Sequence, residues 1–343
     1  MKINNTHYRT VWYDTAKHVV SMIDQIKLPF EFEIVELKNY KETAEAIRNM
    51  TVRGAGAIGA TAGFAMAQAF VSCSNTDELK AAKAFIEATR PTAVNLFYAT
   101  QKVFEAGQKG VGDAIEMAQN IADEDAEFCR LIGEHGNQLI QKDNKILTHC
   151  NAGWLAFVDY GSALSPIYAA HKAGKNPFVY VDETRPRGQG ARLTAFELFH
   201  NEVEHRVIAD NAAGFYMSKK QVDMVITGAD RITANGDVAN KIGTLEKAIL
   251  AREFDIPFYV AAPFSTFDFD TSCGDDIIIE ERGDEELLCH EGLDEKNNLC
   301  TIRMASPGSK GLNPAFDVTP AKYITAFITD RGIIKPSELK NYR

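Results

Sequence analysis

The sequence lacks several features that would point to familiar classes of protein. It has no run of about 18 consecutive apolar residues, so we expect no transmembrane helix and no membrane partner. Its first residues lack the basic-then-apolar order of a secretory signal, which makes the cytoplasm the expected location. Basic residues number 37 against 47 acidic ones, which disfavours a nucleic-acid partner because phosphate backbones need clustered Lys and Arg.

The cysteines also exclude some chemistry. The six cysteines form no C-x-x-C pair, and no zinc spacing occurs among the Cys and His residues, so we expect no metal. In a cytosolic chain, cysteines scattered in this way are usually reduced and packed. What the sequence does have is 45% hydrophobic residues over 343 positions, enough for one or two globular domains.

The first part of the chain is predicted to be mainly helical. Residues 30–37 alternate like a strand. Helical spacing, in some places with favourable caps, marks four segments: 41–50, 57–71, 76–88 and 111–142. Arg90-Pro91 is expected to begin a further helix with Thr92. We therefore predict a helical N-terminal domain with a small sheet over residues 1–128.

After about residue 145, short apolar runs alternate with helical stretches. Such alternation predicts βαβ units and a parallel sheet, so the fold class is α/β and the second domain spans 129–343. The expected strands are 145–149, 178–182, 206–210, 224–228 and 257–261. The expected helices are 153–173, 190–203, 213–221 and 240–254. Residues 280–298 are acidic and predict a solvated surface loop or short helices.

Polar or reactive side chains follow each predicted strand. Because ligands bind beyond the carboxyl ends of parallel strands, these tips predict a pocket. The tips are residues 149–151, 182–185, 210–211, 228–231 and 262–265.

Two of these tips carry residues suited to catalysis. Cys150 is followed by Asn-Ala-Gly, which can open a helix, and a helix N-terminus lowers the pKa of a thiol. The alternative is a packed thiol without a chemical role. Asp230 follows Gly228-Ala229, whose small size lets a ligand approach closely.

Positive side chains near the tips suggest an anionic ligand. Asn240 and Lys241 are expected at the start of a helix, where a cation is unfavourable unless it meets an anion, so Lys241 should face a phosphate. The turn after the second strand holds Arg185, Arg187 and Arg192, and Arg185 could instead pair with Glu183 or Asp182.

Two motif readings are rejected. Residues 54–59 spell G-x-G-x-x-G, but no strand precedes them and no acidic partner follows at the right distance, so no dinucleotide cofactor is expected. This turn can still hold a phosphate beside Arg53. Residues 230–241 do not match an EF-hand loop, and Asn235-Gly236 is better explained as a turn.

The motifs together resemble methylthioribose-1-phosphate isomerases of the methionine salvage pathway. These enzymes belong to a wider family with the α, β and δ subunits of initiation factor 2B. The matching stretches include TVRGAGAIG, ILTHCNAGWLA, YVDETRPRGQGARLTAFEL and ITGADRITANGDVANKIGT, and they cover most of the chain. The resemblance implies a Rossmann-like C-terminal domain, a homodimer and no cofactor.

The resemblance also implies roles for individual residues. Cys150 is implied as the catalytic cysteine and Asp230 as the proton donor. The implied substrate-binding residues are Arg53, Gly54, Ala55, Arg90, Gln189, Asn240 and Lys241. The implied substrate is a small sugar 1-phosphate, 5-methylthioribose 1-phosphate, with 5-deoxyribose 1-phosphate as a further candidate.

Two departures from the family pattern affect the identity of the sugar. Gly56 stands where these isomerases usually have proline, and Arg187-Gly188 stand where they usually have apolar residues. An added arginine could favour a second phosphate, as in ribose-1,5-bisphosphate isomerases, or could face solvent. The other alternative is a non-catalytic regulatory protein like the initiation factor 2B subunits.

Overall fold

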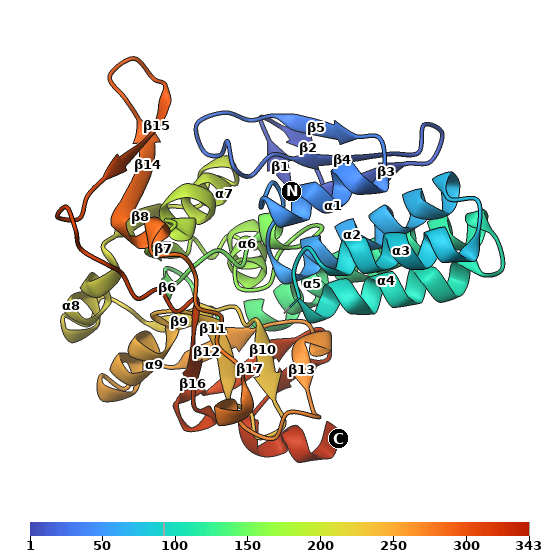
Figure 1. The fold of residues 1–343 in the computed structure, drawn as a ribbon. Helices are drawn as coiled ribbons and strands as arrows, with labels where there is room; N and C mark the ends of the chain where they lie inside the picture. The colour runs from blue at the N-terminus through green and yellow to red at the C-terminus, as the bar shows by residue number, and fades with distance from the viewer. Residues whose placement is uncertain (92, 343) are drawn as a thin grey trace.

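The structure is a computed structural model that describes residues 1–91 and 93–342 (Figure 1). Thr92, which the sequence analysis placed at a helix start, lies outside the described residues. The chain begins with a short hairpin and a three-stranded antiparallel sheet, the small sheet that the sequence predicted. These strands are β1 (Lys2–Ile3), β2 (Thr6–His7), β3 (Val11–Asp14), β4 (Val19–Ile23) and β5 (Ile34–Leu37).

Five helices then form the body of the N-terminal part. They are α1 (Tyr40–Arg48), α2 (Ala55–Ser72), α3 (Thr76–Glu87), α4 (Val94–Gly107) and α5 (Val111–Asn137). In length and composition α2 could cross a membrane, but 83% of it is buried inside the structure. Its alanines and glycines let α4 and α5 pack closely against it, so α2 is the core helix of this part.

The helix α5 joins the two parts of the chain. It ends at Asn137 rather than at residue 142, and the domain boundary predicted at 128/129 falls inside it. Its second half contacts α6 (Ser165–Lys172), β17 (Ala326–Thr329) and β18 (Gly332–Ile334), which belong to the C-terminal part.

A seven-stranded sheet forms the C-terminal part. Its strands are β6 (Lys145–Thr148), β7 (Phe178–Asp182), β8 (His205–Ile208), β9 (Met224–Thr227), β12 (Phe258–Ala261), β17 and β18. All five predicted strands are confirmed, whereas β17 and β18 were missed. Apart from the antiparallel β18, the strands are parallel in the order β8-β7-β6-β9-β12-β17. In chain order this is 3-2-1-4-5-6, the Rossmann arrangement, so the predicted α/β fold is confirmed.

The helices of this part are shorter than predicted. The segment 153–173 contains only a 3₁₀ turn at Trp154–Ala156 and α6. The next segment is a π-helical turn, Gly190–Thr194, followed by α7 (Ala195–His200). The last two predicted helices, 213–221 and 240–254, are α8 (Ala213–Ser218) and α9 (Thr244–Glu253).

A second, four-stranded sheet corrects one prediction. It contains β13 (Phe267–Asp268), β10 (Arg231–Thr233), β11 (Val238–Lys241) and β16 (Phe316–Thr319), in that order. Asn240 and Lys241 end the strand β11 instead of beginning a helix, because β11 pairs with β10 through the turn at Asn235-Gly236 and with β16 on its other side. Lys241 therefore does not begin a helix, and the prediction that a helix dipole opposes its charge was wrong.

The acidic segment 280–298 was also only partly predicted. It holds the short helix α10 (Glu285–Leu288), but a hairpin follows, made of β14 (Cys289–Leu293) and β15 (Leu299–Arg303). The hairpin projects from the upper left of Figure 1.

Candidate active site

A cavity of about 100 Å³ lies at the carboxyl ends of β6 and β9. This is where the strand order reverses, the place where open parallel sheets bind ligands. Its walls include all nine residues that the family resemblance implied: Arg53, Gly54, Ala55, Arg90, Cys150, Gln189, Asp230, Asn240 and Lys241. Both halves of the chain therefore contribute to one cavity.

Cys150 follows β6 in an uncommon backbone conformation. Its φ of 64° is in the left-handed region, which non-glycine residues adopt mainly where surrounding contacts hold them. Here the Cys150 amide donates to Thr184 Oγ1 at 2.8 Å, and the Thr194 hydroxyl donates to the Cys150 carbonyl at 2.7 Å. These two contacts hold the Cys150 backbone in this conformation.

The predicted cause of thiol activation was wrong. Residues 151–153 are not helical, so no helix N-terminus faces Cys150. Burial raises the pKa of the Cys150 thiol above its usual value, while the charges of Arg53 and Lys241 act in the opposite direction. Nearby cations, rather than a helix dipole, are what favours the thiolate here.

Asp230 faces the same cavity from the end of β9. Its backbone amide donates to the Ala239 carbonyl at 2.9 Å, which ties it to β11. A side chain at Gly228 would overlap Ala152, so glycine there lets the β9 tip and the Cys150 loop pack closely. Burial raises the pKa of the Asp230 carboxyl, and the surrounding cations, Arg53 first, oppose this shift. A carboxyl group in this setting is suited to hold and donate a proton.

Cationic side chains gather around these two residues. The Arg53 guanidinium donates to the side chain and the carbonyl of Asn151, both at 2.8 Å. Lys241 is 3% exposed, and its ammonium has no hydrogen-bond partner among the described residues. Burial lowers the pKa of both Lys241 and Arg90. Buried cations of this kind predict an anionic ligand.

Arg282 also lines the cavity and was not among the predicted site residues. Its guanidinium pairs with Glu280 at 3.1 Å and lies over the Phe316 ring. It was missed because it lies in the acidic segment that was interpreted as a solvated surface.

A buried polar network adjoins the cavity, and His149 of this network is one of the lining residues. His149 Nδ1 lies 2.6 Å from Asp182 Oδ2, and its Nε2 lies 2.8 Å from the Ile242 carbonyl. Burial, aided by Lys247, lowers the pKa of His149 to about 4, and burial raises that of Asp182 to about 6. The ring therefore joins the Cys150 strand end to the loop after Lys241.

The same network has the ligand types of a metal site. His149, Asp182 and Asp210 bring one ligand atom each to within 4.8 Å of one another. However, the Lys247 ammonium lies 2.8 Å from Asp182 Oδ2 and 2.8 Å from the Asp210 carbonyl. A fixed ammonium in this position supplies the positive charge that a metal ion would bring.

The other strand tips contribute less than predicted. Asp210, at the β8 tip, supports the backbone amides of Thr184 and Arg185 instead of lining the cavity. Residues 262–265, at the β12 tip, are not among the described residues that line it. The Arg185 side chain pairs with neither Glu183 nor Asp182. It contacts His290 at 2.6 Å and the Leu287 carbonyl at 2.8 Å.

Comparison with known proteins identifies the family. Residues 51–336 match the sequence model of the Initiation factor 2 subunit family. The chain belongs to this family.

Relatives in the family are similar over their full length. The methylthioribose-1-phosphate isomerase of Methylorubrum extorquens is 49% identical, over 98% of this chain and 96% of its own. That of Acetivibrio thermocellus is 49% identical, over 95% and 97%. The crystal structure of 5-methylthioribose 1-phosphate isomerase from Pyrococcus horikoshii OT3 superposes with a TM-score of 0.86, at 42% identity and over 100% and 98% of the two chains. A structure described as translation initiation factor eIF-2B, subunit delta, from A. fulgidus gives 0.83 at 39% identity, over 97% and 100%.

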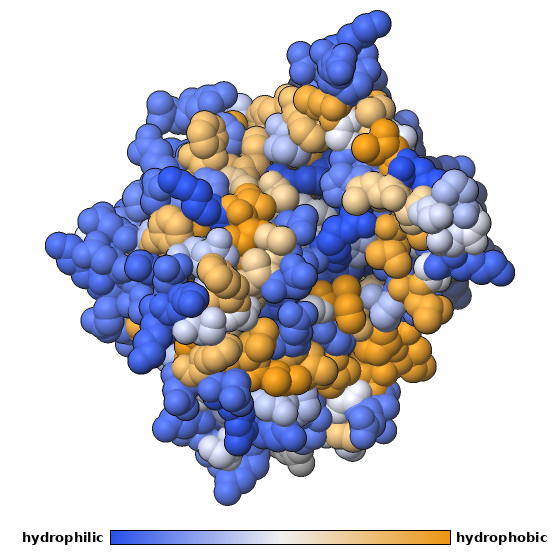
Figure 2. Space-filling model, turned by 90° about the vertical axis from the view of Figure 1, so that its left-hand side faces the viewer, coloured by the Kyte–Doolittle hydropathy of each residue, from blue (hydrophilic) through white to orange (hydrophobic). Residues whose placement is uncertain are grey.

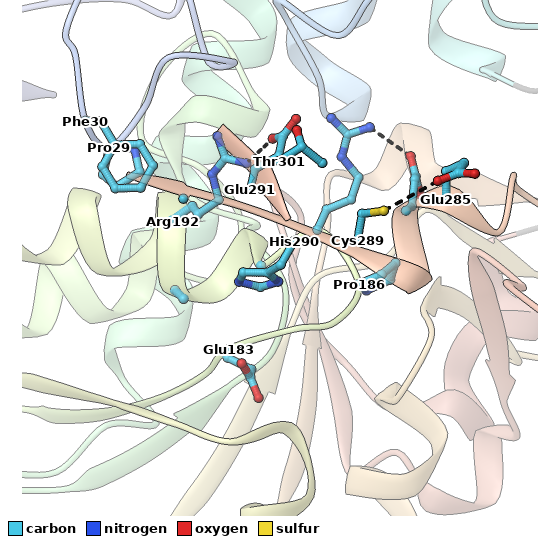
Figure 3. Close-up of a pocket in the computed structure, with 15 residues that line it drawn as sticks. Pro29, Phe30, Glu183, Pro186, Arg192, Glu285, Cys289, His290, Glu291 and Thr301 are labelled. Atoms are coloured by element: carbon cyan, nitrogen blue, oxygen red, sulfur yellow. Dashed lines mark hydrogen bonds and ion pairs between the residues drawn. The ribbon is translucent and has the colours of Figure 1, made fainter. Parts of the chain in front are cut away.

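Arg187, a departure from the family's usual pattern, lies between the cavity lined by Cys150 and a larger one. The larger cavity, about 600 Å³, lies between the turn after β7 and the β14–β15 hairpin (Figure 3). Arg187 lines both cavities and pairs with Glu286 at 2.9 Å. Its second contact is with the Met50 sulfur at 3.0 Å. The guanidinium charge is thus already neutralised by a carboxylate of α10.

Proposed function

We propose that this chain is an aldose–ketose isomerase that converts 5-methylthioribose 1-phosphate into 5-methylthioribulose 1-phosphate, a step of methionine salvage. The observation that carries the proposal is that Cys150 and Asp230 face one cavity from two neighbouring strand ends. The buried Lys241 and three half-buried arginines line the same cavity: Arg53, Arg90 and Arg282. The cations suit the phosphate, and the acid and the thiol suit proton transfer on the sugar.

The mechanism begins at the ring oxygen, because a phosphate ester on C1 prevents simple opening to an aldehyde. Asp230 donates its proton to the ring oxygen, and the bond from C1 to that oxygen breaks. Cys150, as thiolate, removes the proton from C2, which leaves an enol phosphate with a double bond between C1 and C2. The proton then returns to C1, and the C2 hydroxyl gives its proton back to Asp230, which yields the ketose.

A hydride shift from C2 to C1 is the competing route. In that route Asp230 still protonates the ring oxygen, and Cys150 does not carry the migrating hydrogen. Turnover in deuterated water separates the two routes. Appreciable deuterium at C1 supports the enol, and its absence supports the hydride shift.

The group on C5 is proposed to be methylthio rather than phosphate. Arg187, the residue that raised the bisphosphate alternative, is paired with Glu286. A second phosphate would have to displace this carboxylate. The 5-deoxy sugar stays compatible with the site because it brings no second charge.

A substrate panel tests the proposal directly. The 1-phosphates of 5-methylthioribose, 5-deoxyribose and ribose 5-phosphate should be compared by kcat/KM. We expect the methylthio sugar to be preferred and the bisphosphate to be the poorest substrate. A protein that binds sugar phosphates in calorimetry but turns none of them over would be a regulatory member of the family, and the proposal would be wrong.

We also propose that the protein is a cytoplasmic homodimer. Phe199 and Phe215 are 70% and 59% exposed on α7 and α8, and Val207 is 47% exposed on the edge strand β8 between them in sequence. The face that carries these elements shows apolar patches among hydrophilic ones (Figure 2). Exposed apolar patches are typical of subunit contacts. Light scattering of the wild type and of Phe215→Asp tests whether this face holds a dimer together.

A further inference from the structure

Asn151 links the catalytic cavity to a buried carboxylate behind it. Its side-chain oxygen accepts from the Arg53 guanidinium at 2.8 Å, and its backbone carbonyl accepts from the same guanidinium at 2.8 Å. Its side-chain amide donates to Glu197 Oε1 at 2.8 Å and to Thr194 Oγ1 at 3.2 Å. Both Asn151 and Glu197 are buried. The Asn151 side chain therefore has a fixed partner on each side.

Glu197 accepts hydrogen bonds on both of its carboxylate oxygens. A Cβ atom at Gly153 would lie 1.8 Å from Glu197 Oε2, so only glycine lets the loop after Cys150 pack this closely on the carboxylate. Four uncharged donors surround the group at 2.8 to 3.1 Å: the Asn151 side chain, the Trp154 and Leu155 amides, and the Tyr168 hydroxyl. Glu197 is thus a rigid acceptor beside the loop that carries Asn151.

This arrangement determines which way the Asn151 amide points. A carboxylate only accepts hydrogen bonds and a guanidinium only donates them, whereas a side-chain amide has one accepting end and one donating end. The donating end of Asn151 must face Glu197, and the accepting end must face Arg53. The reverse orientation would oppose two donors on one side and two acceptors on the other.

The anchor of Arg53 differs from the anchors of two other arginines that line the cavity. Arg187 pairs with the Glu286 carboxylate at 2.9 Å, and Arg282 pairs with Glu280 at 3.1 Å. Arg53 is instead held by two uncharged oxygens of Asn151. Such an anchor fixes the guanidinium and leaves its positive charge available to an anion in the cavity.

The charge of Arg53 also acts on both catalytic candidates. Among the surrounding cations, Arg53 is the one that most strongly lowers the pKa of Cys150 and the pKa of Asp230. The direction in which Asn151 holds the guanidinium therefore affects the ligand and the reacting groups together.

We infer that Asn151, oriented by Glu197, is a positioning residue that holds Arg53 with its charge free for the phosphate of the substrate. The inference rests on the proposed function and adds to it a residue outside the predicted catalytic and substrate-binding set. Asn151 acts through Arg53 and not on the sugar itself.

The test is Asn151→Asp, which keeps the size of the side chain and its accepting end but places a carboxylate on Arg53. The new carboxylate also faces Glu197, so this variant should be less stable. Adding Glu197→Gln restores a donor between positions 151 and 197, while the carboxylate on Arg53 remains. The control is Asn201→Asp, which removes a 2.7 Å hydrogen bond to the Glu197 backbone carbonyl at a residue that is not among the described lining residues.

Three measurements on the full-length protein separate positioning from a structural role. Thermal melting reports stability, calorimetry with inorganic phosphate reports anion binding, and turnover of 5-methylthioribose 1-phosphate gives KM and kcat. We expect Asn151→Asp to weaken phosphate binding and to raise KM roughly tenfold, with a smaller change in kcat. The double variant should recover much of the melting temperature but none of the phosphate affinity. Asn201→Asp should lower the melting temperature alone.

Phosphate affinity that recovers together with the melting temperature in the double variant, or that never falls, would overturn the inference. Normal turnover by the wild type would then leave the isomerase proposal standing. A wild type that binds phosphate but converts no sugar phosphate would refute the isomerase proposal, and the phosphate titrations would still decide the role of Asn151. If Asn151→Asp does not fold, the double variant provides the same comparison with the wild type.

Discussion

His149 and Asp182 lie 2.6 Å apart beneath the catalytic cavity, and both side chains are withdrawn from solvent. Lys247 completes the group at 2.8 Å from the same carboxylate. This contact matters for function because His149 directly precedes Cys150 and also reaches the loop after Lys241.

We expect His149→Asn to reduce kcat, by up to about 10²-fold, because the shorter side chain cannot span Asp182 and the Ile242 carbonyl. His149 acts here as a positioning residue. The pH dependence of Cys150 alkylation by iodoacetamide, mapped by mass spectrometry, should shift together with kcat. His171→Asn, on the partly exposed α6, is the control. A full loss of folding, or an alkylation profile identical to that of the wild type, would contradict positioning.

Lys247→Met should destabilise the protein by about 3–5 kcal/mol, because it leaves a buried carboxylate without its counter-charge. The double variant Asp182→Asn with Lys247→Met should lose less unfolding free energy than the two single variants lose together. Urea unfolding of the wild type, both single variants and the double variant gives the coupling energy between the two residues. Additive losses would show that the ion pair contributes nothing beyond packing.

Cys150→Ser and Asp230→Asn should each lower kcat by about 10²–10⁴-fold while the circular dichroism spectrum stays the same. The physical reason is that each change removes a proton-transfer group and keeps its shape. The matched control is Cys73→Ser, which changes a cysteine that does not line the cavity. Near-normal turnover in either catalytic variant would refute its assigned role.

Lys241→Met should raise KM and also stabilise the ligand-free protein, on the order of 1–3 kcal/mol. The reason is that the Lys241 ammonium is buried without a partner among the described residues. Thermal melting with and without inorganic phosphate measures both effects, since phosphate should stabilise the wild type more than the variant. A destabilised variant would mean that Lys241 has a structural role.

Asp125 gives a pH dependence of stability. Burial raises its pKa to about 7 from a usual 3.8, with Arg9 opposing and Asp159 reinforcing the shift. The folded state holds the Asp125 proton more tightly than the unfolded state does, so this protonation stabilises the fold. The stabilisation is fully present below pH 4 and is lost as the pH rises through 7. An asparagine side chain at position 125 cannot ionise, so the melting temperature of Asp125→Asn should rise relative to that of the wild type between pH 5 and pH 8. Melting temperatures that change in parallel with pH for the two proteins would contradict this prediction.

Much of the fold could be predicted because buried parallel strands are apolar throughout. The five apolar runs of the sequence correspond to five strands of the sheet. The polar residues that follow these runs include the two catalytic candidates. The strand β11 could not be recognised in this way. Its residues Val238–Lys241 are half polar, and only pairing with β10 and β16 makes them a strand.

Other parts of the site depend on contacts between distant segments. Arg282 belongs to an acidic stretch whose pattern indicates solvent, and only the fold brings it beside Asp230. The same holds for Asp182 and Lys247, which meet His149 from two other elements. The local periodicity of a sequence does not predict such contacts between distant segments. The residues that the family resemblance implied do line one cavity, because family motifs reflect a site that is already assembled.

Gly56 and Asp125 share one small space behind the catalytic cavity. A Cβ atom at position 56 would overlap the Asp125 carboxylate and the Phe157 ring. A relative with proline at this position must therefore leave room opposite it, by a smaller residue or a displaced carboxylate. The residues at positions 56 and 125 thus constrain each other's size, and we expect them to change together during evolution rather than one at a time.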